Sequence, residues 1–234
     1  MKKYCRQIKL PLSDSGRLIK MKKFINLLKI LSGTRFLVRR LHIKFIIKQT
    51  AGREFGTVVD VGAGRAPYKK FIKCEKYVPL DIENLYNVPD MIVCDLNRAM
   101  PLQNSFCDLV IMTETLEHVK KPQFVLSEIF RILKPGGKLL MTSPFVWPVH
   151  GSPNDHFRYT NFGIEYLLKE NGFQDISVKP SNGYIYTMCQ LLVINCRRFL
   201  LRPFVLAINI FGYLIGSKTG SKNFPLGQQA VAKK

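Results

Sequence analysis

The sequence has no uncharged, apolar run long enough to cross a lipid bilayer. After Arg202 the longest stretch without a charge runs from Pro203 to Ser217, whereas a membrane-spanning helix needs about 20 apolar residues. Lysines between positions 20 and 29 interrupt every early apolar run, so we expect no signal peptide. Any association with a membrane is therefore expected to be peripheral.

Closely spaced cysteines and histidines are missing as well. The six cysteines lie at positions 5, 74, 94, 107, 189 and 196, without a C-x-x-C pair, and the four histidines form no His-rich cluster. Structural zinc sites and disulfide scaffolds are built from such groupings. We therefore expect reduced thiols, a cytoplasmic protein and no bound metal.

Acidic residues are almost absent from the two ends of the chain. The net charge of +20 divides into +13 for residues 1–50, −1 for residues 51–175 and +8 for residues 176–234. Both basic ends are also apolar, and an anionic membrane surface attracts such segments at least as well as nucleic acid does. A membrane surface is the favoured partner, and nucleic acid is the alternative.

The stretch from Val58 to Arg65 organises the rest of the chain. Its β-branched residues predict a buried parallel strand, which ends in Asp60 and in the glycines Gly62 and Gly64. Glycines at this spacing let the backbone turn tightly and approach a ligand. A dinucleotide fingerprint would require a third glycine where Pro67 stands, so nicotinamide and flavin cofactors are disfavoured.

Further strands and helices alternate after this turn. Strands are predicted at 77–81, 91–96, 107–112, 138–144 and 176–179, helices at 122–133 and 162–170, and a last strand at 228–234. Asp81 lies 21 residues beyond Asp60, near the ~20-residue separation that brings an acid to a ribose in doubly wound sheets. A carboxylate suits this role because it accepts hydrogen bonds from two hydroxyls at once.

Three motifs together resemble one enzyme family. The D-x-G-x-G turn begins at Asp60, the stretch 106–119 ends in Leu-Glu-His-Val, and residues 133–139 read Leu-Lys-Pro-Gly-Gly-Lys-Leu. Their order is similar to that of class I S-adenosylmethionine-dependent methyltransferases of type 11. The resemblance implies an α/β, Rossmann-like, seven-stranded and mostly parallel sheet with an antiparallel last strand.

The resemblance also implies a binding site for S-adenosyl-L-methionine. The glycine turn would hold the methionine portion together with the end of the fourth strand, the second strand would end at the ribose, and the third strand would end at the adenine. The donor-binding residues implied in this way are Asp60, Gly62, Ala63, Gly64, Asp81, Ile82, Asp95, Leu96, Thr113 and Glu114. Glu117 and His118 are expected to orient the following turn.

Residues 149–160 are the densest polar cluster in the chain. They resemble the H-x-x-P-x-D-x-x-R-Y-T loop of type 11 enzymes of surface-glycan and lipid-linked sugar pathways, although Gly151 stands where many relatives carry an acid. A neutral imidazole, from His150 or His156, is a suitable base near pH 7. Asp155 would orient it and Arg158 would hold an anionic group. The alternative is that these side chains only brace the loop.

The chain divides into a basic amphipathic helical extension (1–50), a core (51–180), an apolar helical insertion (181–223) and a last core strand (224–234). The insertion and the extension are expected to contact a membrane, with core packing or a dimer interface as the alternative. These features predict O-methylation of a glycan or lipid-linked acceptor at the cytoplasmic membrane face. Methylation of a quinone, another lipid or RNA, and a non-catalytic membrane-bound partner, are the alternatives. The oligomeric state stays open.

Overall fold

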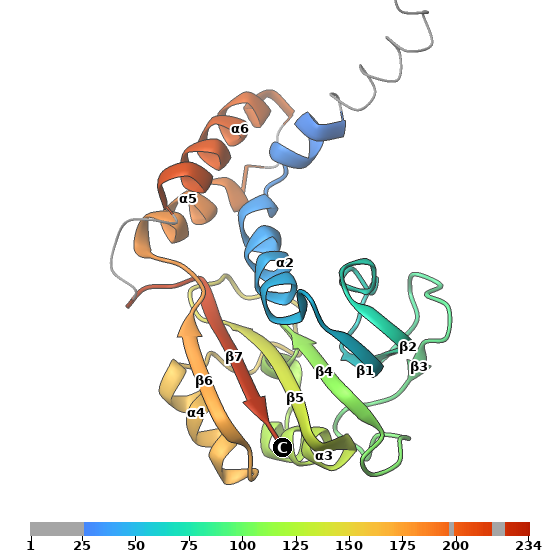
Figure 1. Ribbon diagram of the computed structural model, residues 1–234. Helices are drawn as coiled ribbons and strands as arrows, with labels where there is room; N and C mark the ends of the chain where they lie inside the picture. The colour runs from blue at the N-terminus through green and yellow to red at the C-terminus, as the bar shows by residue number, and fades with distance from the viewer. Residues whose placement is uncertain (1–25, 197–198, 217–222) are drawn as a thin grey trace, which may run out of the picture.

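A computed structural model describes residues 26–196, 199–216 and 223–234. A seven-stranded sheet with the order β3-β2-β1-β4-β5-β7-β6 forms its centre (Figure 1). The strands are β1 (Glu54–Val61), β2 (Lys73–Asp81), β3 (Ile92–Val93), β4 (Cys107–Thr113), β5 (Leu133–Pro144), β6 (Gln174–Pro180) and β7 (Gly227–Lys233). The pairs from β3 to β5 are parallel, and β7 lies antiparallel between β5 and β6. The predicted fold class is confirmed.

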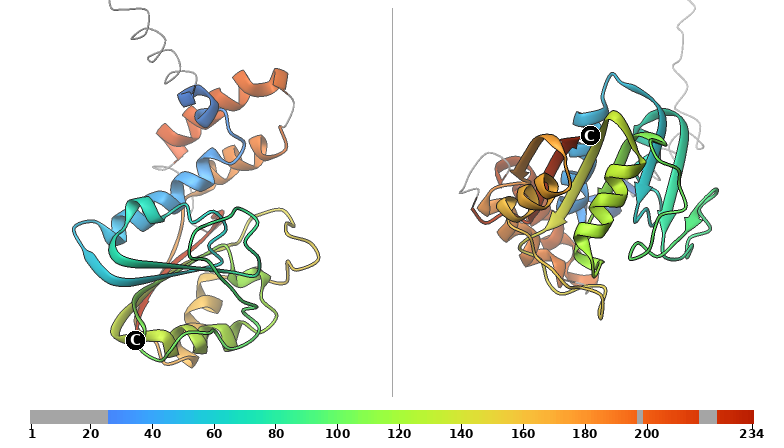
Figure 2. Two further views of the ribbon diagram at one scale, coloured as in Figure 1. Left: turned by 90° about the vertical axis from the view of Figure 1, so that its right-hand side faces the viewer. Right: turned by 90° about the horizontal axis from the view of Figure 1, so that it is seen from below.

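Helices cover both faces of this sheet (Figure 2). Successive side chains of a strand point to opposite faces, so Val58 packs on one face with Phe45 of α2 (Phe36–Thr50), and Val59 packs on the other. The second face is covered by α3 (Pro122–Ile132) and α4 (Asn161–Glu170). Each fully buried valine contributes about 1.5–3 kcal/mol. This two-sided burial holds the strand ends rigidly in place.

The ends of α3 and α4 follow from local sequence. Pro122 occupies the first turn of α3, where its missing N–H costs no hydrogen bond. The Thr160 side chain accepts a hydrogen bond of 3.0 Å from the Gly163 amide and so caps α4. Gly172, with φ of +83°, follows the end of α4 in the left-handed conformation expected of a helix stop.

The N-terminal extension and the insertion form one helical layer, defined here as α2, α5 (Tyr184–Ile194), α6 (Arg202–Phe211) and the π-helical turn Gly212–Gly216. The Gln190 side chain accepts a 3.1 Å hydrogen bond from the Val38 amide, and Tyr186 donates one of 2.8 Å to the Leu37 carbonyl. Figure 1 shows α5 and α6 beside the start of α2. Segments predicted as separate units therefore share a small core.

The helical layer joins the sheet at its carboxyl edge. α5 follows the end of β6, and the chain returns to start β7 with Gly227 paired to Pro144, the last residue of β5. Parallel α/β sheets bind their ligands at this edge. The insertion is thus placed beside the part of the sheet where an acceptor molecule is expected.

Two expectations for the basic ends can be compared with the structure. A break at Ser32-Gly33 is present between helical residues 26–31 and α2, whereas residues 1–25 lie outside the described part. α2 packs as a core helix, with Leu37 and Ile46 fully buried and its basic residues exposed, as in the alternative to membrane contact. None of the helices in the described ranges combines the length and the apolar character that crossing a bilayer requires.

Candidate functional site

The glycine turn after β1 leaves its backbone open to a ligand. Gly62 has φ of +72° and Gly64 has φ of +53°, a region that favours glycine. A Cβ atom on Gly62 would lie 2.2 Å from Thr115 Oγ1, whereas a Cβ on Gly64 would meet no atom within 4 Å. The Gly62 and Ala63 amides both donate to the Leu80 carbonyl at 2.9 Å. The turn is therefore locked to β2 with free space above Gly64.

Asp81 lies where the sequence predicts it, at the carboxyl end of β2 facing the glycine turn. The Gly64 amide donates to Asp81 Oδ2 and the Ile82 amide to Oδ1, both at 2.7 Å. Each carboxylate oxygen keeps a second lone pair, and the side chain is only half-buried. Ile82 is 63% exposed beside it. The carboxylate is oriented, accessible and able to accept two further hydrogen bonds.

Asp60 lies beneath the turn rather than on its open side. Its side chain is 1% exposed, Tyr77 donates a 2.6 Å hydrogen bond to Oδ2, and Oδ1 has no hydrogen-bond partner among the residues that the structure describes. Burial raises the pKa of Asp60 to about 7. The Tyr77 hydrogen bond acts in the opposite direction and lowers the pKa, whereas the negative charge of Asp81 raises it further. Asp60 therefore supports the turn from below and holds a proton in much of the neutral range.

We expect Asp60→Asn to change how stability depends on pH. The folded protein keeps the Asp60 proton up to about pH 7, whereas the unfolded chain releases it near 3.8. The contribution of the protonated Asp60 carboxyl to the free energy of unfolding is fully present below pH 3.8 and is lost as the pH rises toward 7. Between pH 5 and 7 the variant should gain about 2 kcal/mol relative to the wild type. Urea denaturation at several pH values measures this, and parallel curves would contradict the buried proton.

The remaining predicted donor residues also lie at the carboxyl edge. Asp95 Oδ1 accepts two 2.9 Å hydrogen bonds from Asn97, which lower the pKa of Asp95, and Leu96 is buried beside it. Thr113 ends β4 half-buried. Glu114 turns toward the helical layer, since its Oε1 accepts from Thr142 at 2.8 Å and lies 3.4 Å from His42 Nε2 of α2. The carboxylate of Glu114 thus links the sheet to α2.

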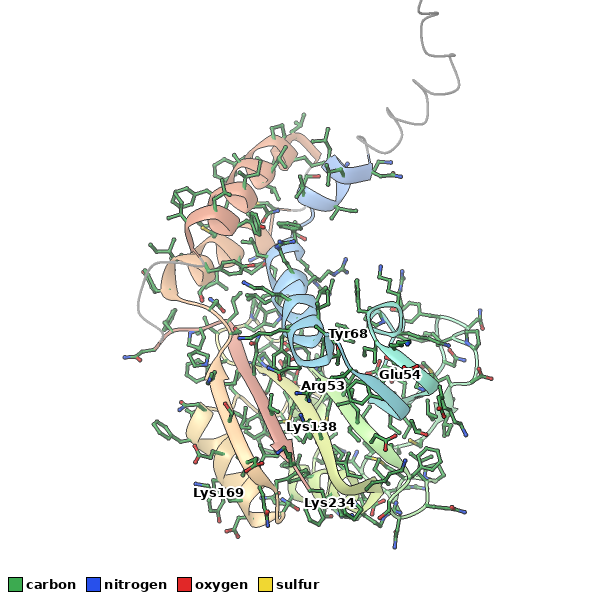
Figure 3. The ribbon with its side chains drawn as sticks, viewed as in Figure 1. Arg53, Glu54, Tyr68, Lys138, Lys169 and Lys234 are labelled. Atoms are coloured by element: carbon green, nitrogen blue, oxygen red, sulfur yellow. The ribbon has the colours of Figure 1, made fainter. Side chains whose placement is uncertain are left out.

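Tyr68 adds a contact that sequence reasoning missed. It follows the glycine turn and belongs to the buried cluster that also contains Val58 of β1 and Phe45 and Ile46 of α2. Figure 3 shows Tyr68 beside α2. Burial raises the pKa of Tyr68 to about 12. The neutral phenol is therefore part of the core that α2 forms with β1.

Three of the four predicted catalytic residues meet in the loop after β5. Arg158 binds Asp155 through two hydrogen bonds of 2.6 and 2.7 Å, and the His150 amide donates to Asp155 Oδ2 at 2.9 Å. The hydrogen bonds from Arg158 hold the pKa of Asp155 far below its usual range. Arg158 is thus engaged with Asp155. The His156 ring is exposed and lies next to Phe157, while its backbone amide donates a 2.9 Å hydrogen bond to the Glu117 carbonyl.

Glu117 is the functional candidate that the sequence did not reveal. Its side chain is 0% exposed, and neither carboxylate oxygen has a hydrogen-bond partner among the described residues. Oε1 lies 3.7 Å from the Nε2 atoms of both His118 and His150. Burial raises the pKa of Glu117, and the nearby Glu117 and Asp155 carboxylates raise the pKa of His150. The Leu-Glu-His-Val motif could have pointed to Glu117. His150, which lies beside Glu117 in the structure, is 33 residues away in the sequence.

The sequence comparisons support one family. Residues 59–141 match the family model described as "Methyltransferase domain". A curated relative, Methyltransferase AacuQ of Aspergillus aculeatus, is 32% identical over 105 residues, which cover 40% of this chain and 34% of the relative. The chain therefore spans about a third of the length of this curated relative.

Solved structures agree on the fold. A SAM-dependent methyltransferase from Archaeoglobus fulgidus superposes with a TM-score of 0.57 at 16% identity, covering 90% of this chain and 99% of that one. Phosphoethanolamine N-methyltransferase 2 of Haemonchus contortus, in complex with S-adenosyl-L-methionine, reaches a TM-score of 0.57 at 17% identity. That match covers 82% of this chain and 51% of the other. At these identities the likeness concerns the fold.

Proposed function

Because residues 59–141 match the family model described as "Methyltransferase domain", we propose that the chain is an S-adenosylmethionine-dependent methyltransferase. Its proposed reaction is the transfer of a methyl group to an oxygen of a glycan or lipid-linked acceptor at the cytoplasmic face of the membrane. The proposal that the donor binds here rests on one observation, the position of the Asp81 carboxylate opposite the open glycine turn.

The donor pocket can be argued residue by residue. Asp81 offers the free lone pairs of a fixed carboxylate to the two ribose hydroxyls. The amino-acid portion is assigned to the side of Gly64, where a Cβ atom would meet no atom of the described residues within 4 Å. Asp95 and the buried Leu96 lie next along the edge, at the place of the adenine. This order of residues along the carboxyl edge supports the proposal that a sulfonium nucleoside binds there.

The donor supplies a methyl group on sulfur that is already electrophilic. The chain then has to align the acceptor oxygen with it, and such positioning contributes roughly 7–11 kcal/mol in favourable cases. The loop of residues 145–160 leaves the end of β5 at the same edge, which makes it the acceptor-binding loop. His150 is the base assigned to the acceptor hydroxyl, and the Asp155–Arg158 pair positions it.

The proposed class of acceptor is inferred from the exposed side chains of the helical layer. The layer exposes large apolar side chains, for example Phe204 (56%), Phe211 (48%) and Leu214 (57%), and the Arg40 guanidinium of α2 lies 4.2 Å from the centroid of the Tyr213 ring. Exposed apolar patches flanked by lysine and arginine bind anionic lipid interfaces. A lipid-linked or glycan acceptor would then approach the carboxyl edge from the membrane side.

The deciding experiment incubates the protein with methyl-labelled donor and with lipid, glycan and RNA fractions. Label in the lipid or glycan fraction is expected, because the basic residues of the helical layer accompany apolar ones. RNA methylation is the competing enzyme function, favoured by the charge of +20. Label confined to the RNA fraction would contradict the proposal of a lipid-linked or glycan acceptor. Absence of donor binding to the folded protein would instead favour a non-catalytic partner, so the two failures are distinguishable.

A further inference from the structure

One cluster at the carboxyl edge is left unexplained by donor binding. Glu117, His118 and His150 each direct a ligand atom to the same place, and these atoms all lie within 4.8 Å of one another. Glu117 comes from the turn after β4, whereas His150 comes from the acceptor-binding loop. The separations of 3.7 Å from Glu117 Oε1 to each Nε2 are longer than an N–H···O hydrogen bond. The three groups face one another without bonding.

The hydrogen bonds on the far side of each imidazole define its orientation. His118 Nδ1 lies 2.7 Å from the Asn154 carbonyl, an acceptor, so Nδ1 carries the proton and Nε2 keeps its lone pair. His150 Nδ1 lies 3.3 Å from the Pro148 carbonyl and 3.4 Å from Asp155 Oδ2, which favours the same tautomer. Histidine ligands of metals are oriented in this way by a carbonyl or carboxylate on the other nitrogen.

The buried carboxylate is the second, independent observation. Glu117 is 0% exposed and both of its oxygens lack hydrogen-bond partners among the described residues. A buried carboxylate without partners is costly, and a bound cation removes that cost. A protonated His150 is the other source of positive charge, but its Nε2 does not come within hydrogen-bonding distance of Glu117.

We propose that Glu117, His118 and His150 bind one divalent transition-metal ion through Glu117 Oε1 and the two Nε2 atoms. Two imidazoles and a carboxylate suit Zn²⁺, Mn²⁺, Fe²⁺ and Co²⁺, and leave coordination positions open. Both histidine side chains are 27% exposed, so water or an acceptor oxygen can reach the ion. The site departs from the sequence prediction of no metal, because residues distant in sequence supply its ligands.

The role of this ion rests on the proposed function. A hydroxyl bound to the metal ionises near neutral pH, as metal-bound water does. The proton is released to solvent, and the resulting alkoxide oxygen forms the new bond to the methyl carbon as the carbon–sulfur bond breaks. His150 then acts as a ligand, and the metal replaces it as the group that activates the acceptor.

Metal binding is testable without donor or acceptor. The full chain, stripped with a chelator, is titrated with Co²⁺ and followed by visible absorption, and Zn²⁺ is then added as competitor. We expect one ion per chain at micromolar or lower concentration. His118→Gln and His150→Gln should each weaken binding by at least about 100-fold, because each removes a ligand. Zn²⁺ should raise the wild-type Tm by several degrees.

His156→Gln is the matched control, since it removes a histidine of the same loop that lies outside the cluster. It should bind Co²⁺ as the wild type does. Glu117→Gln preserves shape and removes the buried charge, so its metal-free Tm should not fall, while the rise with Zn²⁺ should disappear. No binding of either ion, or equal binding by the His118, His150 and His156 variants, would overturn the site. The methyl-labelling experiment would be unaffected by that result, because His150 would then remain the base.

Discussion

Replacing Asp81 with alanine is expected to weaken S-adenosylmethionine binding by about 100- to 10,000-fold and to leave the protein folded. The carboxylate would accept two hydrogen bonds from the ribose, and each hydrogen bond to a charged group is worth about 1.5–3 kcal/mol. The Gly64 and Ile82 amides lose their acceptor in the variant, but both lie at the accessible edge where water can replace it. Calorimetric titration with the donor measures the affinity, and thermal unfolding checks the fold.

The control is Glu83→Ala. Glu83 is an exposed acid two residues after Asp81, so its replacement removes the same charge without removing the ribose acceptor. Its donor affinity should stay within about threefold of the wild type, since isolated surface charges contribute roughly 1 kcal/mol or less. If both variants bind the donor equally well, the assignment of the ribose to Asp81 is wrong.

Replacing Gly62 with alanine is expected to lower the free energy of unfolding by about 4 kcal/mol. The added Cβ would lie 2.2 Å from Thr115 Oγ1 and 2.6 Å from Thr115 Cγ2, and overpacking of this kind costs about 1–3 kcal/mol. The φ of +72° adds about 1–2 kcal/mol for any residue with a Cβ. Urea denaturation measures the loss.

Gly64→Ala separates the two contributions. Gly64 has a similar φ of +53°, but its Cβ would meet no atom within 4 Å. This variant should lose only the backbone contribution of about 1–2 kcal/mol. Equal losses in the two variants would show that Thr115 moves aside and that the contact does not restrict position 62.

Local patterns determined most of the core. The β-branched run before Asp60 and the apolar spacing of residues 122–133 each specify an element by themselves. Their order along the chain then selects the sheet, and its seven strands, mostly parallel with β7 antiparallel, confirm the predicted fold class. The ends of the elements shifted by a few residues; β2, for example, begins at Lys73 instead of residue 77. The positions proposed for donor binding could be predicted because they lie at or just beyond the carboxyl ends of parallel strands, which meet at one edge of the sheet.

The arrangement of the proposed acceptor site depends on contacts between residues that are distant in the sequence. Sequence spacing gave no reason to place His42 beside Glu114, or Glu117 between His118 and His150. The sequence pattern predicts that the extension and the insertion are independent amphipathic segments. In the structure they share a buried cluster that contains Leu37 and Tyr186. A periodic pattern specifies which face of a helix is apolar; it does not specify which partner covers that face. The sequence by itself therefore determined the sheet and its carboxyl edge, whereas only tertiary packing brought together the groups of the proposed acceptor site.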